Sequence, residues 1–192
     1  MTLRVTFDLG DDDLKHFQLI MREARNAIKD LDQATIVRAA HDLLKEIRSV
    51  KVPQFILERL AKLETMIGMV TDEEWKLPDS EKTRVLNALA YFSEPEDLIP
   101  DHIPGLGFLD DAIMIELVVR ELKHEIEAYA DFCTYRSVEE NRRKQHGKDD
   151  TVTREEWLTQ RRSELHSRMR RRRRRERSHA HGSGRRSPFS LL

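Results

Sequence analysis

The chain has 192 residues, of which 39% are hydrophobic and 36% are charged, and a single cysteine, which excludes an intrachain disulfide. That length suits one domain with appendages, and the hydrophobic fraction is sufficient for a buried core. No apolar run approaches the roughly 20 residues of a transmembrane helix, and the N-terminus lacks the pattern of a signal peptide, so we expect a cytoplasmic protein.

The net charge of −1 conceals an uneven distribution of charged residues. Residues 1–135 contain 27 acidic and 16 basic side chains, whereas residues 136–192 contain 8 acidic and 18 basic ones. The sequence therefore predicts an acidic body followed by a basic extension.

A strand pattern is found only at the N-terminus, where Leu3, Val5, Phe7 and Leu9 alternate with polar residues. A lone strand leaves its backbone amides and carbonyls unpaired, so residues 2–9 are expected to pair with a second copy, giving a homodimer, or with another protein's sheet edge. An extended arm that lies on the helices fits the same pattern equally well.

Apolar residues then recur at spacings of three and four, which predicts helices. Three such segments run from Leu14 to Leu31, from Asp32 to Val50 and from Pro53 to Val70, a fourth runs from about Ser80 to Phe92, and the longest ends at Cys133. The short connections favour antiparallel neighbours. We predict an all-α bundle of about five main helices.

The fourth and fifth segments are separated by a loop rich in proline, glycine and aspartate. Pro100 and Pro104 prevent a regular helix, and Gly107 permits a positive φ or a close backbone approach. Asp110 and Asp111 come where the next helix is expected to begin, so they are candidates for capping its free amides.

This stretch resembles the YkvA-like bacterial family, a small helical domain of unknown function. The resemblance covers roughly residues 80–130 and lies in the ordered positions Asp97, Pro100, Asp101, Pro104, Gly107, Asp110 and Asp111, preceded by Ala88-Leu-Ala-Tyr-Phe92. It implies a fold but no activity. Members of this family often continue into membrane-spanning helices, which this sequence is not expected to do.

The aspartates of the loop admit two interpretations. Asp97, Asp101 and Asp111 could bind Mg²⁺ or Mn²⁺ for hydrolysis, with His102 as a base. Alternatively, they cap helices and form Asx turns. We favour the structural role because the sequence shows neither a dedicated nucleophile nor a phosphate-binding loop. No cofactor and no catalytic residue is assigned, and the enzyme hypothesis stays secondary.

The character of the chain changes after Tyr135. We predict an acidic helical domain over residues 1–135, a polar linker or fraying helix end over 136–152, a basic helix over 153–177 and a disordered tail over 178–192. The basic helix opens with Thr153 and Glu156 at the spacing of a capping box and then carries a thin apolar stripe.

The arginines of the basic helix are the strongest functional signal in the sequence, because eight of them fall within residues 168–177. Guanidinium groups pair bidentately with phosphates, so the extension is predicted to bind RNA or DNA without sequence specificity. The candidate contacts are Arg161, Arg162, Arg168, Arg170, Arg171, Arg172, Arg173, Arg174, Arg175 and Arg177. We predict a non-enzymatic interaction protein whose acidic body binds a protein partner.

Three other roles fit the same basic tail. It could bind an anionic membrane surface, with Trp157, Leu158, Phe189, Leu191 and Leu192 as anchors. It could fold back on the acidic body of its own or another copy, since their charges nearly cancel. It could also be an inert solubilising segment.

Overall fold

The structure is a computed structural model of all 192 residues, and it describes them except for 1–7, 9, 28–30, 94–107, 147–152 and 183–192. The described residues form seven α-helices and one 3-10 helix, with no β-strand among them, so the predicted all-α class is confirmed. The helices are α1 (Asp11–Ala27), α2 (Gln33–Ser49), α3 (Gln54–Thr71), α4 (Asp79–Leu89), η1 (Ala90–Ser93), α5 (Leu109–Glu121), α6 (Lys123–His146) and α7 (Arg154–Gly182).

Helix starts follow local side-chain chemistry. The Asp32 side chain caps α2 by accepting from the Thr35 amide at 2.8 Å. At the start of α7, the Thr153 amide donates to Glu156 Oε2 at 2.6 Å and the Glu156 amide donates to Thr153 Oγ1 at 3.3 Å. The predicted capping box is therefore confirmed in both directions.

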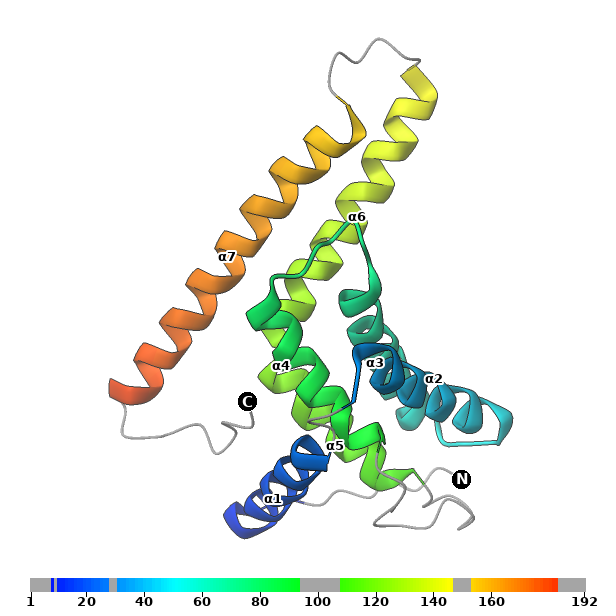
Figure 1. Cartoon of the computed structure of the whole chain (residues 1–192), viewed down its shortest axis with the longest axis vertical. Helices are drawn as coiled ribbons and strands as arrows, with labels where there is room; N and C mark the ends of the chain where they lie inside the picture. Colours follow the sequence, from blue (N-terminus) through cyan, green and yellow to red (C-terminus); the bar gives the residue numbers. More distant parts are fainter. Residues whose placement is uncertain (1–7, 9, 28–30, 94–107, 147–152, 183–192) are drawn as a thin grey trace.

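Helices α1 to α6 form the body of the molecule around one continuous core, to which buried side chains of α7 also belong (Figure 1). Helices α1 and α2 both pack on η1, α3 packs on α5, and α4 lies against α2 and α3. The core includes Met21, Ile47, Leu63, Met66, Leu89, Met114 and Ile115, each exposed by 1% or less. Since η1 carries the aromatic pair Tyr91 and Phe92, both buried, the end of the predicted fourth segment lies in the core.

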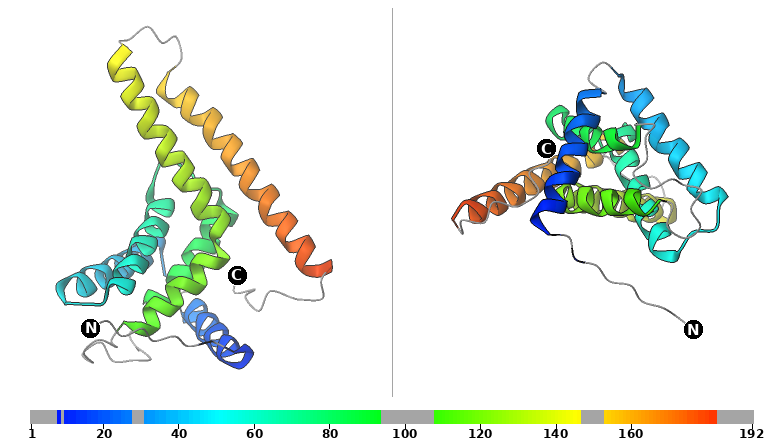
Figure 2. Two further views of the ribbon diagram at one scale, coloured as in Figure 1. Left: turned by 180° about the vertical axis from the view of Figure 1, so that it is seen from behind. Right: turned by 90° about the horizontal axis from the view of Figure 1, so that it is seen from below.

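The described residues form seven α-helices, where about five main helices and one basic helix were expected. The apolar series before Cys133 is divided at Leu122, whose φ of −97° and ψ of 17° depart from helical values. Its amide still donates to the Val118 carbonyl at 2.9 Å, so α5 ends in a closed turn before α6 begins. The two helices run in different directions (Figure 2). A side-chain pattern cannot reveal this change, because the apolar spacing continues across it.

Helices α6 and α7 form an antiparallel pair that extends beyond α1 to α5 (Figures 1 and 2). The thin apolar stripe of α7 is almost fully buried: Trp157, Leu158, Leu165 and Met169 are exposed by 5% or less. Burial of such side chains stabilises by about 1.5–3 kcal/mol each, so four of them suffice to hold the helix in place.

The helices of the extension reach further than the predicted segment bounds. Of the segment predicted as a polar linker or fraying helix end, residues 136–146 belong to α6, where Glu139 pairs with Arg142 at 2.7 Å and with Arg143 at 3.0 Å one helical turn away. Helix α7 continues past Arg177 to Gly182, since no proline or cap interrupts it there. Residues 147–152 and 183–192 lie outside the described part, as does the predicted strand except Asp8.

Replacement of Leu165 by alanine tests the docking of α7. Leu165 is fully buried, and Leu165→Ala should lower the free energy of unfolding by about 2–5 kcal/mol because it leaves a cavity. The matched control Leu19→Ala, at a position exposed by 45%, should change it by less than about 0.5 kcal/mol. Urea unfolding followed by tryptophan fluorescence measures both, and equal effects would contradict the packing of α7.

Candidate nucleic-acid interface

The arginines of α7 lie on two sides of the helix. On the side facing α6, Arg172 Nη1 lies 3.0 Å from Glu127 Oε2, and Arg168 forms an ion pair with Asp131. Glu127 and Asp131 are one turn apart on α6, as are Arg168 and Arg172 on α7, so the two pairs form successive rungs between the helices. Part of the arginine block is thus neutralised by the body.

Arg173 enters a charged cluster between α4, α5, α6 and α7. Its Nη1 lies 2.9 Å from Glu125 Oε1 and its Nη2 lies 3.2 Å from Glu81 Oε1, and both carboxylates are buried. Arg84 reaches the same Glu125 oxygen at 3.5 Å and Glu121 Oε1 at 3.3 Å. Removing charges from water is costly, so the cluster depends on both arginines being in place.

Burial and pairing act against each other within this cluster. Burial tends to raise the pKa of Glu81, but the Ser80 hydroxyl and the Arg173 guanidinium outweigh it and hold that pKa below its ordinary value. Burial raises the pKa of Glu121 and lowers the pKa of Arg84, although the two side chains form an ion pair. Burial therefore outweighs pairing at Arg84 and Glu121, whereas pairing outweighs burial at Glu81.

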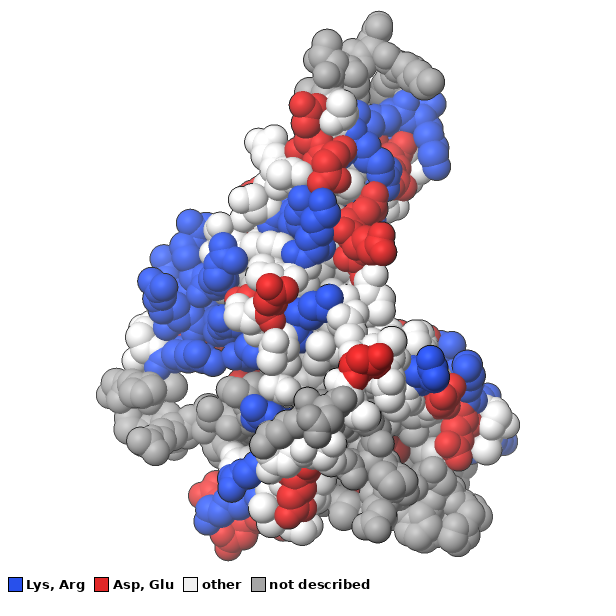
Figure 3. All heavy atoms as spheres, viewed as in Figure 1, with Lys and Arg blue, Asp and Glu red and all other residues white. Residues whose placement is uncertain are grey.

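The opposite side of α7 carries arginines that face water. Arg171, Arg174 and Arg175 are exposed, and none of them forms an ion pair with another residue in the described part of the chain. Their spacing of three and four places them on one face of the helix, flanked by exposed Arg170 and Arg177. Basic side chains gather over the C-terminal half of α7 (Figure 3). We define Arg171, Arg174 and Arg175 as the outer arginine face.

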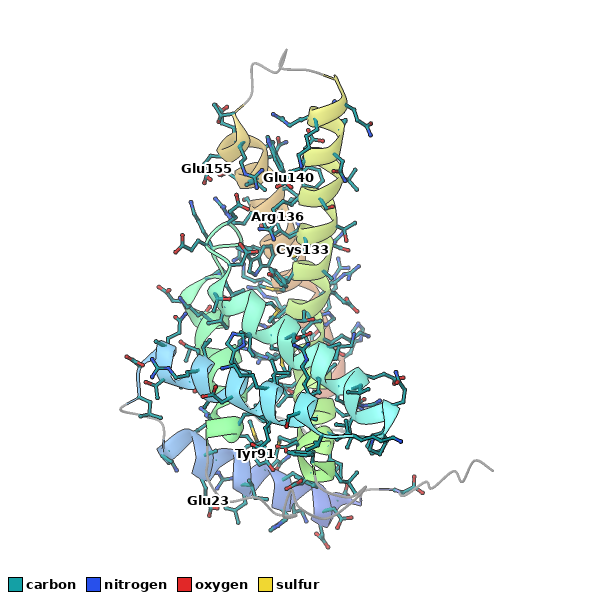
Figure 4. The ribbon with its side chains drawn as sticks, turned by 90° about the vertical axis from the view of Figure 1, so that its right-hand side faces the viewer. Glu23, Tyr91, Cys133, Arg136, Glu140 and Glu155 are labelled. Atoms are coloured by element: carbon teal, nitrogen blue, oxygen red, sulfur yellow. The ribbon has the colours of Figure 1, made fainter. Side chains whose placement is uncertain are left out.

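The N-terminal half of α7 is held by a second set of ion pairs. Arg154 lies 2.8 Å from Glu74 and 2.6 Å from Glu140, while Arg162 donates to the Glu74 carbonyl at 2.7 Å. The hydrogen bond from Arg154 lowers the pKa of Glu74. Figure 4 shows Glu140 on α6 near the start of α7, which carries Glu155. Arg154 and Arg162 therefore attach the N-terminal half of α7 to the body.

Arg161 is also engaged within the molecule. It lies 2.8 Å from Glu164 Oε2, and its guanidinium stacks over the Tyr135 ring at 5.1 Å from the centroid. Among the ten predicted contacts, Arg161, Arg162, Arg168, Arg172 and Arg173 therefore have partners within the described chain, and Arg177 also makes an interaction. The sequence could not show these partners.

Of the loop that resembles the YkvA-like family, the structure describes only the C-terminal end, from Phe108 onward. Phe108 is the N-cap residue of α5, with a φ of 66°, so Asp110 and Asp111 lie buried in the first helical turn instead of at the cap. Asp97, Pro100, Asp101, His102, Pro104 and Gly107 lie outside the described residues. No group of three His, Cys, Asp or Glu side chains suited to a metal ion occurs in the part of the chain that the structure describes.

The described residues of the family resemblance that precede α6 belong to α4, η1 and α5. Residues 81–117 match the family described as "Protein of unknown function (DUF1232)". The chain contains a DUF1232 domain. The buried carboxylate of Glu81 lies at the first position of that match, so α7 packs directly against the DUF1232 domain.

A curated relative supports the same relationship. The chain is 35% identical over 71 residues to the "Uncharacterized membrane protein YkvA" of Bacillus subtilis strain 168, which covers 34% of this chain and 65% of the relative. No solved structure matches. Within the described residues, no helix combines the length and apolar character needed to cross a membrane.

The acidic partners of the arginines on α7 could not be predicted from the sequence. Glu81, Glu125, Glu127 and Asp131 come from two helices, and the first is separated by 92 residues from Arg173. The only available signal was the opposite charge of the two halves, which predicts attraction without naming any pair.

Two neighbouring arginines provide a matched test of the buried cluster. Arg173→Gln should lower the free energy of unfolding by about 3 kcal/mol because Glu81 and Glu125 stay buried with less compensation. Arg172→Gln removes an exposed pair and should cost less than about 1 kcal/mol. Similar losses in urea unfolding would show that the cluster is no more important than a surface pair.

His166 makes the docking of α7 sensitive to pH. Its ring contacts Trp75 edge-on at 4.3 Å and faces Arg162, Arg170 and Glu81, and burial lowers its pKa from 6.5 to about 4. As the pH falls, His166 is protonated in the unfolded chain before it is protonated in the folded chain. Its contribution to the free energy of unfolding is therefore fully present above pH 6.5 and decreases as the pH falls towards about 4, by up to about 3 kcal/mol in total.

The variant His166→Phe isolates this contribution. Unfolding measured between pH 7 and about 4.5 should be less pH-dependent in the variant than in the wild type, because the depressed pKa has been removed. Glu121, whose pKa is raised, contributes with the opposite sign in both proteins and cancels from the comparison. Identical pH profiles would exclude the contribution of His166.

Proposed function

We propose that the outer arginine face of α7 binds RNA or DNA through phosphate groups and without sequence specificity. The observation that carries this proposal is the exposure of Arg171, Arg174 and Arg175 without ion pairs to other described residues, on a helix fixed to the body. Guanidinium groups suit bidentate contacts with phosphate, and each contact releases counterions from the nucleic acid. The proposed function includes no catalytic step.

The docked state of α7 favours phosphate contacts over insertion into lipid. An interfacial helix needs apolar side chains beside its cationic ones, yet Trp157, Leu158, Leu165 and Met169 all face the body. The relative's name mentions a membrane, but the described part of α7 offers an anionic lipid surface only electrostatic attraction. A nucleic-acid backbone requires nothing more.

The proposal narrows the set of arginines that the sequence alone predicts to contact nucleic acid. Arg154 and Arg162 attach α7 to the body, and Arg173 fills a buried cluster, so they are assigned to structure. Some carboxylates of the body are likewise paired with arginines of α7. The proposed function does not include a further protein partner.

Neutralisation of the outer arginine face tests the function. The triple change Arg171→Gln, Arg174→Gln, Arg175→Gln should weaken binding of a fluorescein-labelled single-stranded RNA at least about tenfold at low salt. The slope of log K against log salt should fall by about 2, because three phosphate contacts are lost. Fluorescence anisotropy over a salt series measures both quantities.

A control removes the same charge elsewhere. Arg22, Arg38 and Lys62 are exposed on α1, α2 and α3, and their replacement by glutamine should leave the slope unchanged. Equal losses in the two triple variants would reduce the effect to net charge and would overturn the assignment to α7. Liposomes of anionic phospholipid, tested by flotation, should bind more weakly than RNA.

A further inference from the structure

The ion pairs at the edge of α7 differ from the buried cluster in how easily they can open. Glu127 and Asp131 are 41% and 48% exposed at their side chains, and Arg172 and Arg168 are 49% and 33% exposed. Exposed pairs contribute little free energy, so removal of the carboxylate frees the arginine at little cost to the fold. Arg173 cannot be freed in this way, because both of its carboxylates are buried.

These edge arginines adjoin the outer arginine face. A hollow of about 390 Å³ at the start of α6 is lined by Lys123, His124, Glu127, Arg172, Arg175 and Glu176. Arg175 belongs to the outer arginine face, whereas Arg172 is paired with Glu127 across the same hollow. A phosphate backbone on the outer face would therefore pass beside an arginine that is already occupied.

We propose that Glu127 and Asp131 mask Arg172 and Arg168 from nucleic acid and thereby limit the affinity of the docked chain. The inference rests on the proposed function and adds an intramolecular regulation of the same surface. The two carboxylates act as competitors for phosphate, held at a fixed distance by α6. Neutralising them makes two more arginines available without moving α7.

Helix α7 stays docked when the two edge pairs are removed. Its apolar stripe and Arg173 remain buried, and together they outweigh the two exposed pairs. The chain has two tryptophans, and both lie where α7 meets the body: Trp75 contacts His166, and Trp157 contacts Tyr135. Tryptophan emission therefore reports whether α7 leaves the body.

A double-mutant cycle distinguishes masking from a general change in charge. Arg168→Gln/Arg172→Gln should weaken RNA binding less than about twofold in the wild-type background, where both side chains are occupied. In the Glu127→Gln/Asp131→Asn background, which should bind RNA more tightly than the wild type, the same arginine changes should cost at least about tenfold. Simple electrostatics predicts the same loss in both backgrounds.

A second acidic pair serves as the matched control. Glu46 and Glu73 are exposed and form no ion pair with other described residues, so Glu46→Gln/Glu73→Gln removes the same charge without freeing an arginine. In that background, the loss caused by Arg168→Gln/Arg172→Gln should remain as small as in the wild type. The masking would be overturned by a large loss of RNA affinity in the control background. It would also be overturned if the arginine and carboxylate changes had additive effects on RNA affinity.

Two measurements separate failure of the masking from failure of the proposed function. If wild type and the Glu127→Gln/Asp131→Asn variant both fail to bind RNA, the proposed function and the masking fall together; binding with an additive cycle removes the masking alone. Reaction with phenylglyoxal, located by peptide mass spectrometry, should be slower at Arg168 and Arg172 than at Arg171 and Arg175 in the free wild type. A red shift of tryptophan emission on RNA binding would show that α7 leaves the body and would contradict masking in the docked chain.

Discussion

Arg173, held between the buried carboxylates of Glu81 and Glu125, links the basic end of the chain to the acidic body. The interaction is costly to form because its charges leave water, and removal of one partner is costly as well. The apolar stripe beside it supplies attraction between α7 and the body. The docked position of α7 divides the arginine block into attached and exposed members.

This division changes how the basic extension is understood. A charge count treats all arginines of residues 161–177 as one cationic segment, whereas the docked helix directs some to carboxylates and others to water. Arg154 and Arg162 hold its first half, Arg168 and Arg172 pair along α6, and the outer arginine face remains exposed. Any polyanion that approaches α7 meets a rigid cationic surface backed by competing acidic groups.

The DUF1232 domain forms part of the surface that receives α7. Glu81 lies within the matched residues, while Glu125, Glu127 and Asp131 follow them on α6. The match to the Bacillus subtilis relative spans 65% of that protein, so its description as a membrane protein says nothing direct about the basic helix of this chain. The proposed role therefore rests on α7 and its docking.

The helical class, the first three helices, the capping box at Thr153 and the family of the central motif could be predicted from local sequence, because periodicity and capping are local properties. The positions of the arginines were also known from the sequence, but their division was not, since their partners lie on α4 and α6. Which arginines face water became clear only from the packing of the helices. Ion pairs between distant segments depend on the positions of entire helices, and no spacing along the chain encodes those positions.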